Sequence, residues 1–194
     1  MFSKSDFQEW GKKDVVLFAS VMTRIKGRKD DSLLSTYGFR GFPSFAILDA
    51  EGEAITKKMG RDLPSMRSAV EAATSYSKLK AAKAAGEQVD EAKWFLAQLG
   101  LGQLKPDEAK EQLEKIELSG ADRAKAESEI LVMELTGMMD RVRQDRDGVA
   151  TEVYDLYKAG KRLPDDSQLI GFFAAMVSIG AKTADDAKGY LWAH

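Results

Sequence analysis

Cysteine and histidine, which carry much of the nucleophilic and acid–base chemistry of enzymes, are nearly missing from this sequence. Its 194 residues contain no cysteine and one histidine, His194, which is the last residue. This leaves no basis for a Cys or Ser nucleophile with a histidine base, a Cys/His zinc site, a haem ligand or a disulfide framework. We therefore predict no catalytic residue, no metal site and no cofactor in this chain.

Carboxylate pairs and one basic loop are the remaining candidates for charged chemistry. Each pair precedes or starts a predicted helix, where acids favour the helix dipole, so we assign a capping role to Asp30/Asp31, Asp165/Asp166 and Asp185/Asp186. Four cations around Gly27 could hold a phosphate or a carboxylate, although the adjacent acids favour a solvated loop: Arg24, Lys26, Arg28 and Lys29. The sequence has no phosphate-binding glycine loop and no dinucleotide-binding fingerprint.

The best candidate for a binding site is the run Phe42, Pro43 and Ser44. Proline cannot donate to a strand ladder, so we place Pro43 at the beginning of its strand. An exposed strand start can bind an extended peptide by adding a strand, which needs no side-chain chemistry. The alternative is that Pro43 only shapes the start of the strand and that the aromatic residues belong to the core.

Charge and composition narrow the class of partner. The chain has 29 Lys and Arg against 31 Asp and Glu, a net charge of -2, with no long-range field to attract nucleic acid or an anionic membrane. The most apolar run, residues 169–177, is far shorter than the roughly 20 residues that span a bilayer. We therefore expect a protein or peptide partner, no nucleic acid and no membrane. The N-terminus lacks the apolar region of a signal peptide, which predicts a cytoplasmic location, or a periplasmic or secreted one if a longer N-terminus exists.

Residues 1–77 predict an α/β unit. Residues 15–22 form an apolar, β-branched run without polar alternation, typical of a strand covered on both faces. A short helix is predicted on each side of this strand. The runs 45–49 and 54–59 flank an Asp-Ala-Glu-Gly turn and predict a β-hairpin. A long helix then starts at Leu63, with Asp62 as its cap and Pro64 in its first turn.

Together these elements and residues resemble the second half of a thioredoxin-fold domain, closest to bacterial thioredoxin-like proteins related to disulfide isomerases. The resemblance rests on the run of residues 37–45, on the hairpin sequence of residues 48–53 and on Gly60 before the last helix. It implies that Pro43 is cis. It also implies that the backbone around Phe42, Pro43 and Ser44 pairs with an extended substrate peptide.

The redox chemistry of that family belongs to a Cys-x-x-Cys motif, which this chain lacks. In the family, the strand that carries the motif comes before the segment that begins here at Met1. We therefore expect a thioredoxin-like protein without its own redox cysteines, acting as a peptide- or protein-binding module. The alternative is the downstream part of a thiol-disulfide oxidoreductase whose cysteines lie upstream of Met1. A glutathione-transferase-like protein ranks lower. That family has an acid–serine pair at the start of the helix after the hairpin, and residues 61–65 match this pair poorly.

Residues 78–194 predict an all-α domain. The segments after Lys78 have helical periodicity and pair into three helical hairpins, arranged either as an antiparallel bundle or as a helical-hairpin array. The predicted class is thus α/β followed by all-α, with a partial thioredoxin-like unit over residues 1–77 and a helical domain over residues 78–194. The missing strand leaves backbone donors and acceptors exposed, so we also expect a homodimer through an open sheet edge.

An insulin-reduction assay should show no activity with this chain, because no thiol is present to carry electrons to the insulin disulfides. Insulin turbidity in the presence of dithiothreitol measures this directly. A rate above that of dithiothreitol alone would contradict the prediction.

Overall fold

The computed structural model describes residues 2–13, 15–20, 32–39, 41–161 and 167–193. The chain divides into two compact units, Met1–Gln103 and Leu104–His194. The domain boundary predicted near Lys78 lies inside a helix of the first unit, α3 (Leu63–Ala84). The two units are described separately below.

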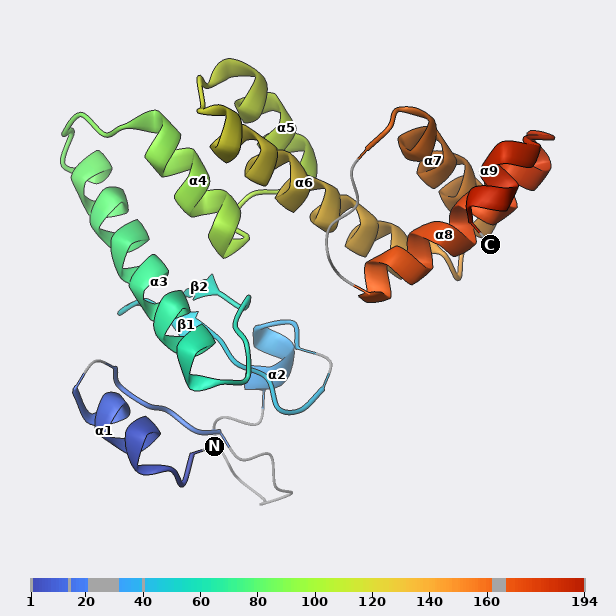
Figure 1. Ribbon diagram of the computed structural model, residues 1–194. Helices are drawn as coiled ribbons and strands as arrows, with labels where there is room; N and C mark the ends of the chain where they lie inside the picture. The colour runs from blue at the N-terminus through green and yellow to red at the C-terminus, as the bar shows by residue number, and fades with distance from the viewer. Residues whose placement is uncertain (1, 14, 21–31, 40, 162–166, 194) are drawn as a thin grey trace. The chain divides into compact units, whose positions relative to one another are not determined.

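A β-hairpin with a long helix beside it forms the centre of the first unit (Figure 1). Strands β1 (Ile47–Leu48) and β2 (Ala54–Thr56) pair antiparallel, which confirms the predicted hairpin. Its turn is fixed by Asp49, whose carboxylate accepts hydrogen bonds from the backbone of Glu51 and Glu53, and by Gly52, whose φ of 86° favours glycine. The remaining helices of the unit are α1 (Ser5–Lys13), α2 (Leu33–Thr36) and α4 (Glu91–Leu101).

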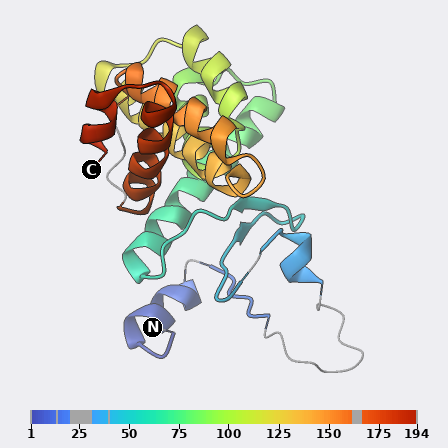
Figure 2. The ribbon, with the colours of Figure 1, turned by 90° about the vertical axis from the view of Figure 1, so that its right-hand side faces the viewer.

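The start of α3 follows the sequence signals closely. The Asp62 side chain accepts a hydrogen bond of 2.9 Å from the Ser65 backbone N–H, and Pro64 occupies the first turn. The helix begins at Leu63, as predicted. It packs on the hairpin through a cluster in which Ile47 and Ile55 meet Ala73 and Tyr76, and the views in Figures 1 and 2 both place α3 beside the strands.

The predicted α/β class, with a partial thioredoxin-like unit, is wrong. The described residues are mostly helical (65%), and the sheet found among them has two strands, order β1-β2. Residues 15–20 of the predicted 15–22 strand are neither helix nor strand, and Val16 is 99% exposed. The physical reason is that this apolar run finds no strand to pair with among the described residues, so its composition alone cannot produce a ladder.

The second unit is built from helices only, within the residues described. They are α5 (Pro106–Lys115), α6 (Gly120–Arg141), α7 (Arg146–Lys158), α8 (Ser167–Thr183) and α9 (Ala187–Trp192). The core lies where α6, α7 and α8 meet, around Leu135, Val153 and Phe173. Helices α7 and α8 approach closely at Gly180, where a Cβ atom would lie 2.8 Å from the Ala150 carbonyl oxygen.

None of these helices, as far as the residues are described, has both the length and the apolarity needed to cross a membrane.

Replacing Phe173 by alanine should lower the free energy of unfolding of the second unit by about 3–5 kcal/mol, because the ring is 1% exposed and its removal leaves a cavity. Chemical denaturation followed by circular dichroism measures the change. The matched control is Leu191→Ala, whose side chain is 74% exposed and whose loss should cost less than about 0.5 kcal/mol. Equal destabilisation by the two variants would contradict this core assignment.

Candidate functional site

The predicted binding residues lie on the surface of the first unit, just before β1. Phe42 is 66% exposed, Pro43 is exposed and Ser44 is half-buried. The Ser44 hydroxyl donates a hydrogen bond to the Gly41 carbonyl, which closes a local turn. The Phe42–Pro43 peptide bond is cis, as the resemblance implied. Because the Phe42 side chain is 66% exposed, its ring is not part of a core. Phe42 precedes β1 in the sequence.

Among the residues that the structure describes, one side of the β1 backbone has no partner. The Asp49 N–H donates to the Glu53 carbonyl, and Leu48 faces Ala54, so the backbone groups of Leu48 point away from β2. By the same alternation, those of Ala46 point outward as well. Within the described residues, no backbone hydrogen bond from outside the hairpin reaches Ala46 or Leu48. This side of the hairpin, from Phe42 to Leu48, is called the β1 edge below.

The outer side of the other strand, β2, is covered by a side chain. The side-chain amide of Gln103 donates to the carbonyl groups of Ala54 and Ile55, at 3.2 Å for Ala54. Next to it, the Lys58 Nζ donates to the Leu99 carbonyl at the end of α4, at 3.4 Å. The Gln103 side chain, which follows α4, thus covers the outer carbonyl groups of β2, whereas β1 has no such cover among the described residues.

A second apolar feature lies close to the β1 edge. Residues 15–19, called the 15–19 segment below, follow α1 and include Val16, Leu17 and Phe18, which are 99%, 56% and 71% exposed. Val15 packs against the same buried cluster as Phe45, so the segment and the β1 edge share one support. The sequence predicted a strand here and did not predict that these side chains are exposed. Hydrophobicity alone does not show whether a partner strand is present to cover them.

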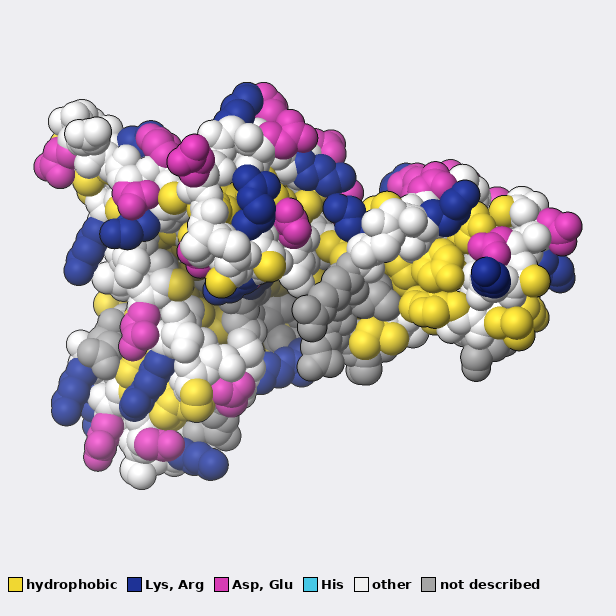
Figure 3. Space-filling view, turned by 45° about the horizontal axis from the view of Figure 1, so that its top comes forward, with side chains coloured by type: hydrophobic (Ala, Val, Ile, Leu, Met, Phe, Trp, Pro, Cys, Tyr) yellow, Lys and Arg dark blue, Asp and Glu magenta, His cyan; other side chains and the backbone are white. Residues whose placement is uncertain are grey.

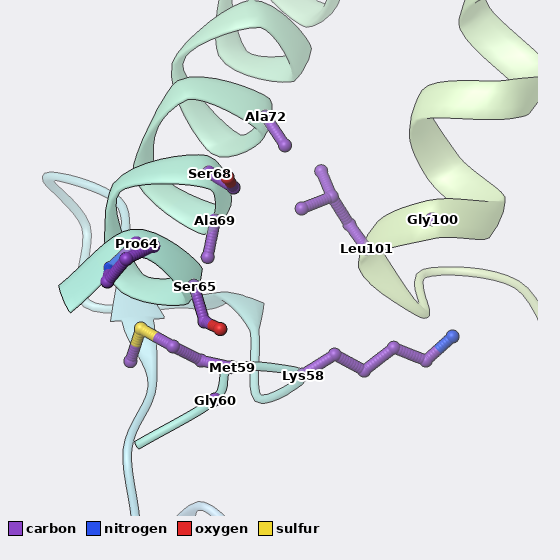
Figure 4. Close-up of a pocket in the computed structure, with 10 residues that line it drawn as sticks. All are labelled: Lys58, Met59, Gly60, Pro64, Ser65, Ser68, Ala69, Ala72, Gly100 and Leu101. Carbon is purple, nitrogen blue, oxygen red and sulfur yellow. The ribbon is translucent and has the colours of Figure 1, made fainter. Parts of the chain in front are cut away.

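A cleft of about 560 Å³ lies between the start of α3 and the end of α4 (Figure 4). Ser65, Ser68 and Ala72 of α3 face Leu101 of α4 across it, and Lys58 extends along its floor toward α4. The Ser65 hydroxyl donates to the Asp62 carboxylate at 2.7 Å. The bond from the Ser65 backbone N–H, followed by the bond from its hydroxyl, lowers the pKa of Asp62, which makes this carboxylate a weaker base. The pair caps α3 and offers no activated nucleophile.

The largest electrostatic perturbation occurs in the second unit. The Tyr154 hydroxyl donates a 2.7 Å hydrogen bond to the Asp186 carboxylate, and this bond, with partial burial, raises the pKa of Tyr154 to about 12. The same bond, followed by the backbone N–H of Gly189, lowers the pKa of Asp186. Asp186 is the N-cap of α9, which confirms its predicted capping role. The pair joins α7 to α9 and holds its proton too firmly for acid–base work at neutral pH.

The other charged candidates lie outside the described residues: Arg24, Lys26, Arg28, Lys29, Asp30, Asp31, Asp165 and Asp166. Across the described part of the chain, no group of three or more His, Asp or Glu side chains is placed to hold a metal ion.

The second unit also exposes apolar side chains. Its large exposed apolar side chains lie on α8 and α9 and are Ile170, Tyr190, Leu191 and Trp192. Figure 3 shows hydrophobic surface gathered over this unit. Trp192 packs on Tyr157 and Phe173, so part of its ring closes the core. This surface consists of helix side chains with internally bonded backbone, unlike the β1 edge.

Comparison with family models, with curated proteins and with solved structures found no match for this chain. The resemblance to thioredoxin-like proteins stays a prediction from the sequence.

Changing Asp186 to asparagine should lower the pKa of Tyr154 from about 12 toward its ordinary value near 10, because the charged acceptor is lost. NMR of tyrosine labelled at Cζ follows this titration. The folded pKa is the higher one, so wild-type stability should fall as pH rises from about 10 through 12. Asp185→Asn, next to the pair, is the control and should leave the pKa of Tyr154 unchanged; a shift of equal size in both variants would contradict the assignment.

Proposed function

We propose that the first unit is a non-catalytic binding module that takes up an extended polypeptide segment at the β1 edge. The observation that carries the proposal is the outward side of β1, where the backbone groups of Ala46 and Leu48 meet no backbone partner within the described residues. An extended segment can form hydrogen bonds with both residues, as in other cases of strand addition.

The surroundings of the edge favour an apolar segment. Phe42 and Leu48 are 66% and 37% exposed at its two ends, and the 15–19 segment adds the exposed rings and methyl groups of Val16 and Phe18. No charged residue occurs from Phe42 to Leu48, so a bound strand loses no hydration of charge there. Backbone pairing would supply register, and these side chains would supply apolar contact.

The proposed activity requires neither a thiol nor an acid–base group, in agreement with a chain that has no cysteine. A cytoplasmic location stays a prediction from the sequence.

Replacing Leu48 by proline tests the role of the backbone. Proline removes the outward N–H, whereas the inward bond from Asp49 to Glu53 is left in place. We expect affinity for a strand-forming peptide to fall about tenfold or more, the equivalent of about 1.4 kcal/mol, the scale of a lost hydrogen bond with its unpaired acceptor. Fluorescence anisotropy measures this with labelled octapeptides in which Val or Phe alternates with Thr.

Leu48→Ala is the matched control, because it shortens the same side chain and keeps the N–H. It should lose only the apolar contact of the side chain and should bind the peptides more tightly than Leu48→Pro. A peptide of the same composition with proline at its centre should bind neither protein. The proposal fails if Leu48→Pro binds like the wild type, or if both variants lose affinity equally while their circular dichroism spectra stay native.

A further inference from the structure

We infer that the segment taken up by the β1 edge is residues 15–19 of a second copy of this chain, exchanged reciprocally between two copies. This inference rests on the proposed function, since it names the partner of the same site. Each copy would give its 15–19 segment to the β1 edge of the other and receive the same segment in return. The result is a closed two-fold dimer.

Both halves of the proposed junction are present in one chain, and neither has a backbone partner among the residues that the structure describes. No backbone hydrogen bond joins residues 15–19 to another described residue. Likewise, no described residue outside the hairpin forms a backbone hydrogen bond with Ala46 or Leu48. The segment and the edge contact the same buried cluster through Val15 and Phe45, but they do not pair with each other. Two copies can satisfy both elements at once.

The 15–19 segment and the β1 edge are also chemically compatible. Charged residues make up 31% of the chain, yet residues 15–20 and residues 42–48 contain none. Exposed edges in soluble proteins are commonly protected by a lysine or another inward charge, and neither of these stretches carries one. Two uncharged, apolar stretches can therefore approach without electrostatic repulsion or loss of charge hydration.

The 15–19 segment is supported by α1. Leu17 leans on α1, where a Cβ on Gly11 would lie 2.6 Å from the Leu17 Cδ1, so glycine permits this close approach. Val16 and Phe18, on either side of Leu17, are 99% and 71% exposed. The segment is thus supported by α1 at Leu17 and exposes large apolar side chains next to it.

The test uses sedimentation velocity and light scattering on the whole chain over a wide concentration range. The variants are a segment variant, Val16→Lys with Phe18→Lys, and an edge variant, Leu48→Pro. The control is Leu191→Lys, which places the same charge on an apolar side chain that is 74% exposed in the second unit. We expect the wild type and the control to form dimers and each of the two other variants to remain monomeric.

Mixing the two monomeric variants gives the sharpest result. A mixed dimer has one junction in which both elements are altered and one in which both are intact, so equal amounts of the two should form dimers again, more weakly than the wild type. If Leu48→Pro loses its native circular dichroism, Leu48→Lys replaces it, because an edge charge opposes strand pairing without removing the N–H.

A monomeric wild type, a segment variant that dimerises like the wild type, or a mixture that stays monomeric would overturn the inference. These results leave the proposed function standing if the labelled peptides still bind the wild type and bind Leu48→Pro more weakly. Peptide binding that is insensitive to Leu48→Pro would instead reject the proposed function, whatever the oligomeric state.

Discussion

A β-strand carries hydrogen-bonding groups on both sides, and a two-stranded hairpin can pair only one side of each strand. In this chain the two outer sides are treated differently. The Gln103 amide occupies the carbonyl groups of Ala54 and Ile55 on β2, whereas the outward groups of Leu48 on β1 find no backbone partner outside the hairpin among the described residues. One edge of the hairpin is covered by the Gln103 side chain, and the other has no such cover among the described residues.

The rest of the first unit supports this arrangement. The helix α3 covers one face of the hairpin through Ala73 and Tyr76, and its first turn is anchored by Asp62. Val15 and Phe45 both pack against the cluster of Phe7, Trp10 and Met66, which keeps the 15–19 segment close to the β1 edge.

Sequence patterns gave good predictions where the cause is local. The hairpin follows from the Asp49 turn and Gly52, and the start of α3 follows from Asp62 and Pro64, because each involves residues only a few positions apart. The strand at residues 15–22 was predicted wrongly over the described residues, because a strand depends on a partner that can lie anywhere in the chain or outside it. The run of Phe42, Pro43 and Ser44 was found from the sequence. The direction in which the Leu48 backbone groups point could be known only from the observed register of the hairpin. The bond between Tyr154 and Asp186, 32 residues apart, has no sequence signal of its own.

Amide hydrogen exchange at β1, resolved by NMR, tests the central claim most directly. In the monomer at low concentration, the Leu48 amide should exchange rapidly, while the Asp49 amide, which donates to Glu53, should be protected. Adding a strand-forming peptide or raising the protein concentration should slow exchange at Leu48 and leave Asp49 nearly unchanged. Strong protection of the Leu48 amide in the free monomer, or no change at Leu48 on binding, would contradict the account.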